Sequence, residues 1–531
     1  MSHIKLIFAL QFLFLYSSCN REQKELTFDN QIIRDTIRNV TILKIDPDVL
    51  KNESDSLKFY YEKMNFREIW YVPENRKDLI NEIKFCYQEG LNPNDYAIEF
   101  IENLESKRAT LTDEELVKYD ILLTQNFEKL ALHLHKGKLN PKEIYKDWDL
   151  KPKNIILSKL LKEAISNQKV ASTFKELKPQ HQLYKLLKKS LLVLNEFPSI
   201  PFTKIEISKE KLQLKDSVQE LISIKKRLHY WKDYTKKDSV YSMVFDTITH
   251  VAVKKFQTRH GLLADGIIGK GTIQALNTSK NERQEQIIAN LERWRWFPAD
   301  LGSDYLIVNL PDFYLHHVVN QDTISKHKVI IGTEKRRTPI LMSKISNFVF
   351  NPTWTIPPTI IKEDLKPSAS KNRNYFSSRN LTIYNNKGQE TSARNWNPER
   401  ASSYRYVQKP GSNNSLGLVK FNFPNNHLVY LHDTNHRDYF EKSFRSLSSG
   451  CVRVENPLAL AKEILVKDNE KKWAKSEIDS ILKRKITQTV FIKNKINVYL
   501  FYWTSWIEGD ELQFRTDIYG LDKELFEKLR N

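Results

Sequence analysis

The chain has 531 residues, and its 84 Lys and Arg against 65 Asp and Glu give a formal net charge of +19. At roughly 150 residues per domain, this length predicts three domains. An apolar fraction of 40% excludes wholesale disorder, while only three cysteines exclude a disulfide scaffold and a cysteine-rich zinc module.

The first nineteen residues have the pattern of an export signal, because a basic start, an apolar run at residues 6–16 and two serines precede Cys19. The apolar run is too short to span a ~30 Å hydrocarbon core, which excludes a polytopic membrane protein. The serines and the cysteine resemble a bacterial lipoprotein signal, although Tyr16 stands where such signals usually carry Leu. The resemblance implies lipidation of Cys19; ordinary signal cleavage nearby is the alternative.

Export changes the meaning of the positive charge. An exported basic protein meets anionic envelope polymers and lipid headgroups instead of nucleic acid. The charge is spread along the chain, which favours a lysine-rich solvated surface over a dedicated polyanion site. We expect a protein of the periplasmic cell envelope, held at a membrane by acylated Cys19 and without a nucleic-acid partner.

A polar linker at residues 20–39 leads into a mostly helical region at 40–210. Residues 112–115 form a capping box, and apolar residues then recur at helical spacing as far as Gly137. No charged cluster with catalytic spacing occurs here, so we interpret the region as a scaffold.

A second helix is predicted at residues 78–89, ending at Gly90. Cys86 lies on its apolar face with Leu79 and Ile83. This position favours a small buried hydrophobe over a reactive thiol.

Residues 216–278 form a compact unit in which a helix at 251–257 and a short helix ending at 276–277 flank a glycine-punctuated loop. The series Phe-Gln, Gly-Leu, Asp-Gly, Gly, Thr and Leu-Asn resembles the signature of the small three-helix peptidoglycan-binding domain. A generic helical spacer is the alternative.

Residues 287–525 are β-rich. Runs of apolar residues bounded by polar turns predict strands at 305–310, 313–319, 327–332, 428–432, 490–506 and 512–519. A polar insertion rich in Ser, Asn and Arg occupies about 362–410. An irregular segment of that length is usually functional, such as a lid that caps a substrate.

The residues with catalytic potential lie in one segment of the chain. His432 stands at the end of a predicted strand, and Cys451 follows nineteen residues later. Only the thiolate of a cysteine attacks, and its ordinary pKa near ~8.5 calls for a neighbouring imidazole. The amides of Gly450 and Cys451 could bind the oxyanion of a tetrahedral intermediate. Asn456 and Pro457 predict a helix start, which would place Cys451 in a turn just ahead of a helix.

Residues 448–453 have the sequence Ser-Ser-Gly-Cys-Val-Arg, with His432 upstream. This sequence resembles the active-site motif of L,D-transpeptidases with the YkuD-type catalytic fold. The order of scaffold, binding module and catalytic domain resembles the large YcbB-like branch over about 40–525. The resemblance implies a multidomain α+β protein whose β-rich catalytic domain carries an inserted capping subdomain. Further matching segments are 289–296, 351–354, 408–411, 416–421 and 430–434.

The resemblance also implies the roles of individual residues. Cys451 is the nucleophile and His432 its base, with His427 and His436 as weaker alternatives. Asp433 faces away from His432, and in the family a backbone carbonyl orients the imidazole. The supporting residues implied are Gly450, Ser448, Ser449 and Arg453 around the oxyanion and the loop, with Arg453 organising the site or meeting a substrate carboxylate, and Tyr430 and Trp354 in the substrate pocket.

The implied reaction is a two-step acyl transfer on peptidoglycan stem peptides and glycan strands. Cys451 attacks the L-centre carbonyl before the terminal D-alanine of a tetrapeptide stem, and an amine of a neighbouring stem resolves the thioester into a 3→3 crosslink. No cofactor or metal is expected, since the pair His133 and His135 diverges on a helix. The alternatives are an L,D-carboxypeptidase, D-amino-acid exchange, protein-to-wall tethering, or a non-catalytic wall-binding lipoprotein.

Overall fold

The computed structural model describes residues 42–531 apart from 202, 236–239 and 474. The expected export signal, Cys19 and the linker 20–39 lie outside the described residues. Within the described part, none of the helices is both long and apolar enough to cross a membrane.

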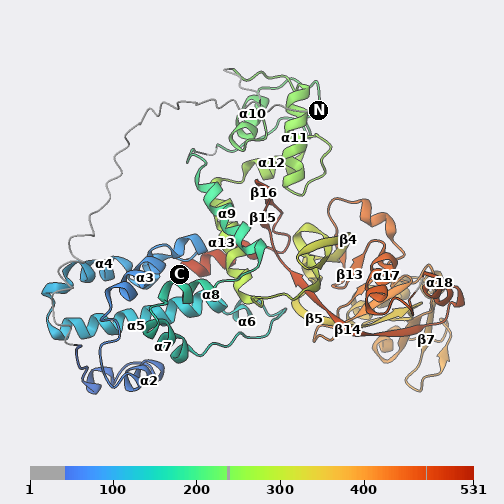
Figure 1. Ribbon diagram of the computed structural model, residues 1–531. Coiled ribbons are helices and arrows are strands. Elements are labelled where there is room, and N and C mark those ends of the chain that lie inside the picture. The colour runs from blue at the N-terminus through green and yellow to red at the C-terminus, as the bar shows by residue number, and fades with distance from the viewer. Residues whose placement is uncertain (1–41, 202, 236–239, 474) are drawn as a thin grey trace, which may run out of the picture.

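Three parts surround a central group of helices, which confirms the multidomain α+β fold: a helical N-terminal region, a small helical module and a β-rich domain (Figure 1). The helices of the first part and its continuation are α2 (Asp55–Lys63), α3 (Pro73–Lys84), α4 (Ile98–Lys107), α5 (Asp113–Lys136), α6 (Pro141–Ile144), α7 (Leu157–Ser166), α8 (Val170–Leu177) and α9 (Gln182–Asn195).

The capping box of α5 is confirmed. Thr112 Oγ1 accepts a hydrogen bond from the Glu115 amide at 3.3 Å, and the Glu115 carboxylate accepts from the Thr112 amide at 2.8 Å. The helix ends at Gly137 as predicted. Each partner satisfies an amide that has no partner within the helix.

The predicted helix 78–89 is corrected at both ends. Helix α3 begins at Pro73, whose fixed φ suits a first helical position, and a separate 3-10 turn (Cys86–Glu89) follows it. Cys86 is only 2% exposed, and burial raises its pKa to about 12. It is the buried hydrophobe that the sequence predicts.

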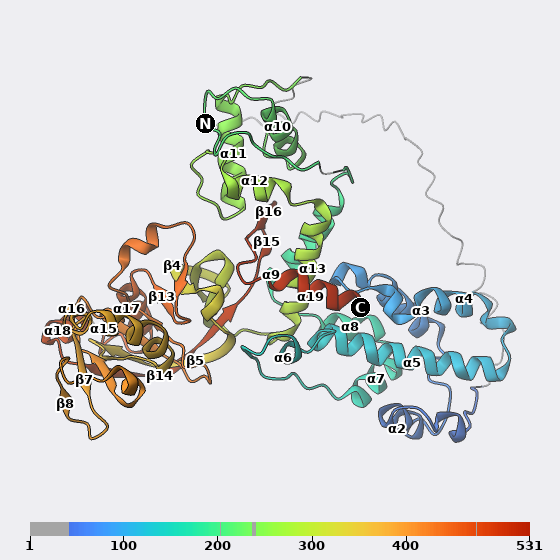
Figure 2. The ribbon, with the colours of Figure 1, turned by 180° about the vertical axis from the view of Figure 1, so that it is seen from behind.

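Three helices lie at the junction of the parts: α9, α13 (Lys280–Trp296) and the C-terminal α19 (Leu521–Arg530), which Figure 2 shows from behind. The core of the N-terminal region runs from Ile45 to Leu177, whereas α9 shares the core of the β-rich domain. The sequence analysis did not predict α19.

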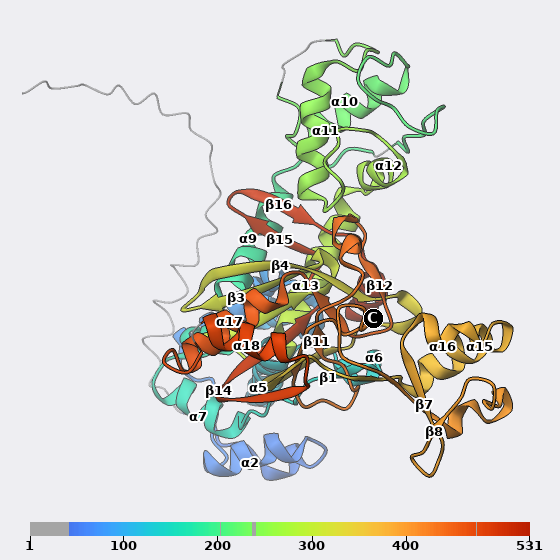
Figure 3. The same ribbon diagram turned by 90° about the vertical axis from the view of Figure 1, so that its right-hand side faces the viewer.

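The small module has three helices, α10 (Glu220–Tyr230), α11 (Thr247–Arg259) and α12 (Lys270–Asn277), as predicted. It packs against a hairpin of β15 (Ser505–Glu508) and β16 (Glu511–Phe514) (Figure 3). Arg515 Nη1 donates to the Arg259 carbonyl at 3.1 Å, and Lys255 pairs with Glu511 at 2.7 Å.

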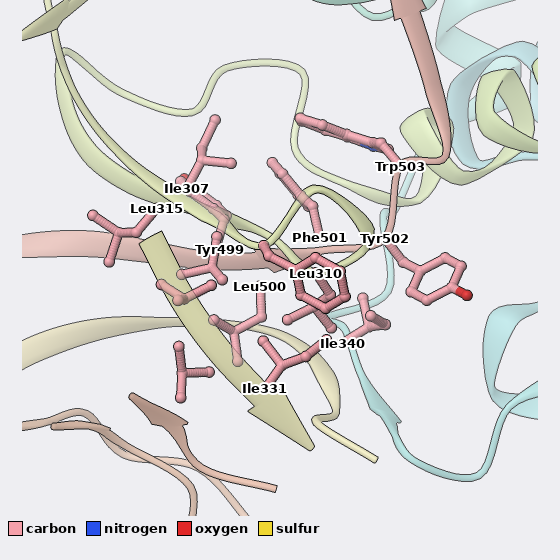
Figure 4. Packing of buried hydrophobic residues seen from close by; sticks show 14 of the residues in the cluster. Ile307, Leu310, Leu315, Ile331, Ile340, Tyr499, Leu500, Phe501, Tyr502 and Trp503 are labelled. Carbon is pink, nitrogen blue, oxygen red and sulfur yellow. The ribbon is translucent and has the colours of Figure 1, made fainter. Parts of the chain in front are cut away.

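The main sheet of the β-rich domain closes on itself, because β14 pairs with both β2 and β5. Figure 4 shows buried hydrophobic residues of its core, among them Leu315, Ile331 and Leu500. Its strands are β1 (Trp148–Asp149), β2 (Asp304–Asn309), β3 (Tyr314–Val319), β4 (Asp322–Gly332), β5 (Ile340–Phe350), β10 (Val419–Asn422), β11 (Leu431–His432), β12 (Ser446–Ser448), β13 (Val452–Val454) and β14 (Gln488–Phe501); α17 (Pro457–Asp468) and α18 (Lys475–Arg484) precede β14.

The insertion, here called the cap, is a folded subdomain, as the resemblance implies, and not the irregular segment that its composition suggests (Figure 3). It begins at Trp354, earlier than predicted, because β6 (Trp354–Thr355) pairs with β9 (Arg405–Gln408). It has its own apolar core around Phe376, Trp396 and Tyr406. Its other elements are α14 (Pro358–Ile360), a π-helical turn (Ile361–Leu365), α15 (Lys366–Lys371), α16 (Asn374–Ser378), β7 (Leu381–Tyr384) and β8 (Glu390–Thr391).

Two predictions near the motif are wrong in detail. The strand expected at 428–432 is only β11, because Asn425 Oδ1 accepts from the amides of His427 and Val429 and holds a turn there. Cys451 is followed by strand β13 and not by a helix.

Two further boundaries differ from prediction. Helix α17 begins at Pro457 as expected, but Asn456 has a φ of +48° and its side chain does not cap the helix. The strand expected at 490–506 breaks after Phe501, where the chain turns into β15.

Candidate active site

Strand register gathers the predicted site residues on one face of the sheet. His432 is paired with Arg453 on β13 and with Lys420 on β10. Their neighbours Leu431, Val452 and Phe421 are fully buried in the core. Because side chains alternate along a strand, Lys420, His432 and Arg453 lie on the opposite face.

Tyr430 and Cys451 lie near the same face of the sheet. Tyr430 is two residues before His432, and Cys451 is two residues before Arg453. Hydrogen bonds from the Tyr430 backbone and hydroxyl reach the Cys451 sulfur. The Tyr430 ring lies edge-on to the His432 ring at 5.5 Å between centroids, and Lys420 Nζ lies 3.8 Å from the Tyr430 ring centre.

The Cys451 thiol is protonated at rest. Burial raises its pKa above the ordinary value, and this effect outweighs the Tyr430 hydrogen bonds and the cations Lys420 and Arg453, which lower it. The side chain is nevertheless partly exposed. Nucleophilic attack by this sulfur would require a base that removes the thiol proton.

His432 is a neutral imidazole with a fixed tautomer. Its Nδ1–H donates to the Asp433 carbonyl oxygen, which is an acceptor only, so Nε2 carries a free lone pair. Burial, followed by the Arg453 cation, lowers its pKa to about 3. The backbone carbonyl thus orients the imidazole in the way that the resemblance implies.

Among the described residues, no hydrogen bond joins the His432 ring to Cys451. Catalytic hydrogen bonds are often long without substrate and tighten in the complex. The rivals are placed differently: His436 stacks on Tyr439 at 5.1 Å, and His427 lies in the turn before β11. Asp433 Oδ2 accepts from the Leu418 amide and Arg437, so it does not act on His432.

The loop before Cys451 is held from both sides. Ser448 Oγ donates to the Cys451 carbonyl at 2.6 Å and accepts from the Gly450 amide at 3.2 Å. Thr338 Oγ1 donates to the Gly450 carbonyl at 2.8 Å. The Gly450 amide already donates to Ser448 Oγ. Of the two amides that the sequence suggested as oxyanion donors, only that of Cys451 is therefore available.

Gly450 has a φ of +115°, a conformation that side chains disfavour. An added Cβ would meet the Arg337 carbonyl oxygen only at 3.5 Å. The backbone conformation, rather than lack of space, is therefore what requires glycine.

A cavity of about 390 Å³ lies between the cap and this loop. Ser449 and Arg453 line it on the catalytic side and Trp354 on the cap side. Arg336 ties the two sides together, since its guanidinium donates to Ser449 Oγ at 2.8 Å, to Glu363 at 2.8 Å and to Asp364 at 2.7 Å.

Lys420, Arg336 and Thr338 are site residues to which the sequence analysis gave no role. Lys420 alternates with the buried Val419 and Phe421 of β10, as polar residues do in any strand with one buried face, so its position carried no specific signal. Arg336 and Thr338 lie far from the motif in sequence and carry no signal either.

The chain matches three family descriptions: "Scaffold domain" over residues 55–191, "Putative peptidoglycan binding domain" over 217–276 and "L,D-transpeptidase catalytic domain" over 303–478, the last being the YkuD family. A protein of Haemophilus influenzae named "Putative L,D-transpeptidase" is 37% identical over 272 residues. The alignment covers 50% of this chain and 54% of that protein, so the chain spans about half the length of this relative.

Among solved structures, an L,D-transpeptidase (Yku) from Stackebrandtia nassauensis shares 15% identity with a TM-score of 0.21, over 55% of this chain and 94% of that one. An L,D-transpeptidase from Xylanimonas cellulosilytica shares 13% identity with a TM-score of 0.17, over 56% of this chain and 100% of that one. From the family matches and the curated relative, the chain carries an L,D-transpeptidase catalytic domain of the YkuD family, joined to a scaffold domain and a peptidoglycan-binding domain.

Proposed function

We propose that the protein is a peptidoglycan L,D-transpeptidase with Cys451 as nucleophile and His432 as base. The observation that carries the proposal is the neutral, carbonyl-oriented imidazole on the same sheet face as a partly exposed thiol. A cavity capped by a folded subdomain adjoins that face.

In the first step, His432 Nε2 takes the thiol proton while the sulfur attacks the carbonyl that precedes the terminal D-alanine of a tetrapeptide stem. The Cys451 amide binds the oxyanion of the tetrahedral intermediate, since this donor has no partner among the described residues. The C–N bond breaks, the imidazolium returns its proton to the departing amine, and a thioester remains.

In the second step, an amine of a neighbouring stem attacks the thioester carbonyl. The C–S bond breaks, the thiol is regenerated, and a 3→3 peptide crosslink forms. The cap shields the thioester from water, which is the competing acceptor. The peptidoglycan-binding module raises the local concentration of glycan strands.

Arg453 is suited to the stem's terminal carboxylate. Its side chain is half-buried, and its buried Nε has no hydrogen-bond partner in the described part of the chain. Burial lowers its pKa, so an incoming anion would stabilise the charge.

Export, periplasmic location and anchoring by a lipidated Cys19 belong to the same proposal.

The test is incubation of the purified protein with disaccharide-tetrapeptide, followed by mass spectrometry. We expect a covalent adduct on Cys451, release of D-alanine and 3→3 dimers, and none of these with Cys451→Ala. Bare tripeptides would instead indicate an L,D-carboxypeptidase, and terminal exchange or a protein adduct would indicate the other acceptors. An unchanged product pattern with Cys451→Ala would refute the cysteine mechanism.

A further inference from the structure

We propose that Arg379 of the cap is a specificity-determining residue that binds an internal carboxylate of the donor stem peptide. The inference rests on the proposed function and extends it to substrate recognition. It starts from the charges around the cavity between the cap and the catalytic loop.

Two acidic and two basic residues line this cavity: Glu363, Asp364, Arg379 and Arg453. Both carboxylates pair with the single guanidinium of Arg336, Glu363 at 2.6 Å and Asp364 at 2.7 Å. The two arginines form no ion pair with any described residue. Arg336 brings one positive charge to the two carboxylates, so together with Arg379 and Arg453 these five groups carry a net charge of +1. The two arginines that lack an ion pair favour a ligand that carries carboxylates.

The guanidinium of Arg379 is pre-positioned. Its central carbon lies 4.7 Å from the centre of the Tyr375 ring, and Tyr375 also lines the cavity. Stacking engages the flat face of the guanidinium and leaves its edge N–H groups able to grip a carboxylate with two hydrogen bonds. Gln408 Nε2 donates to the Arg379 carbonyl at 2.8 Å, which holds the backbone in place.

The two arginines belong to different walls. Arg453 is two residues from Cys451 and suits the carboxylate at the end that leaves. Arg379 comes from the cap, whose apolar side chains Ile360 and Leu381 line the same space and suit the aliphatic part of a peptide. A second carboxylate, internal to the stem, fits this wall.

The experiment compares two tetrapeptide donors that share a free terminal carboxylate. One has free internal carboxylates, and the other has carboxamides in their place. We expect the unchanged enzyme to show an about tenfold higher KM for the amidated donor with similar kcat, because a charge-assisted bidentate contact is lost. Arg379→Gln should raise KM for the free donor to the same extent and remove the discrimination.

Arg405→Gln is the matched control, because Arg405 also stacks on a cap tyrosine, Tyr384 at 4.5 Å, but does not line the cavity. It should retain the preference for the free donor. If Arg379→Gln keeps the preference for the free donor, or if both variants lose it, the inference about Arg379 is wrong. The proposed function is not affected by either result. Failure of the unchanged enzyme to acylate either donor would overturn the proposed function itself.

Discussion

At the scale of single residues, burial decides the protonation of the proposed catalytic pair. His432 and Cys451 carry pKa shifts in opposite directions, and burial is the largest cause of both. Each shift favours the neutral form. The resting site thus holds a neutral thiol and a neutral imidazole, and in the proposed mechanism charge develops only as the sulfur attacks.

This arrangement predicts an unusual pH dependence. Because the folded pKa of His432 is about 3, the imidazole stays unprotonated well below pH 6. The rate of Cys451 acylation by a carbapenem-type inhibitor should therefore stay level between about pH 5 and 7, and rise at alkaline pH as the thiol ionises. Mass spectrometry of timed samples measures the rate; a fall by half near pH 6.5 would contradict the expectation.

Lys420 should make the thiol more reactive. Its positive charge lowers the pKa of Cys451, so Lys420→Met should move the pH profile of iodoacetamide alkylation to higher pH. Lys326→Met is the control, since Lys326 Nζ also lies over a tyrosine ring, Tyr314 at 4.0 Å, but does not affect Cys451. Equal shifts in both variants would exclude a specific role for Lys420.

At the scale of elements, Arg336 connects the turn after β4 to both the cap and the catalytic loop. Its removal frees Ser449 and leaves the carboxylates of Glu363 and Asp364 unpaired beside the cavity. The substrate would then meet a loosened loop and two carboxylates that have lost their shared cation.

We expect Arg336→Ala to lower kcat/KM for the tetrapeptide by about tenfold or more, because misplacement of a reacting group by ~1 Å is costly. Lys366→Ala is the control, as it breaks a cap ion pair with Glu399 outside the cavity. Steady-state kinetics with both variants measures the difference. Wild-type kcat/KM in Arg336→Ala would show that the bridge does not position the loop.

At the scale of the whole molecule, helix α13 joins the parts through buried charges. Arg295 is fully buried, pairs with Glu292 at 2.6 Å and donates to the Glu89 carbonyl of the N-terminal region at 2.7 Å. Glu292 accepts from the Leu139 amide at 2.8 Å. Arg293 pairs with Asp522 of α19 in the same helix junction.

Arg295→Met should lower the free energy of unfolding by about 3–5 kcal/mol, because it strands the Glu292 carboxylate in the interior. The double variant Arg295→Met with Glu292→Gln should lose less, since no lone charge remains buried. Calorimetric unfolding measures both, with Lys118→Met as a surface control whose partner Glu114 is exposed. A double variant less stable than the single one would contradict this account.

Much of the molecule was predictable because its signals are local. The capping box at Thr112, the three helices of the small module and the Gly450-Cys451 turn depend on neighbours along the chain. The motif around Cys451, with His432 at a strand end, likewise lies within a short stretch of sequence. The domain boundaries and the roles of individual site residues stay predictions.

The sequence by itself determined the order of the parts and the residues of the motif, since periodicity, capping and glycine turns act over a few residues. Only the tertiary structure decided that the insertion has a core of its own, that α19 returns to α13, and that Lys420 and Arg336 reach the site. The physical reason is that strand register, burial and ion pairing join residues distant in sequence. These same long-range contacts determine the protonation states of His432 and Cys451 and the charge of the cavity beside them.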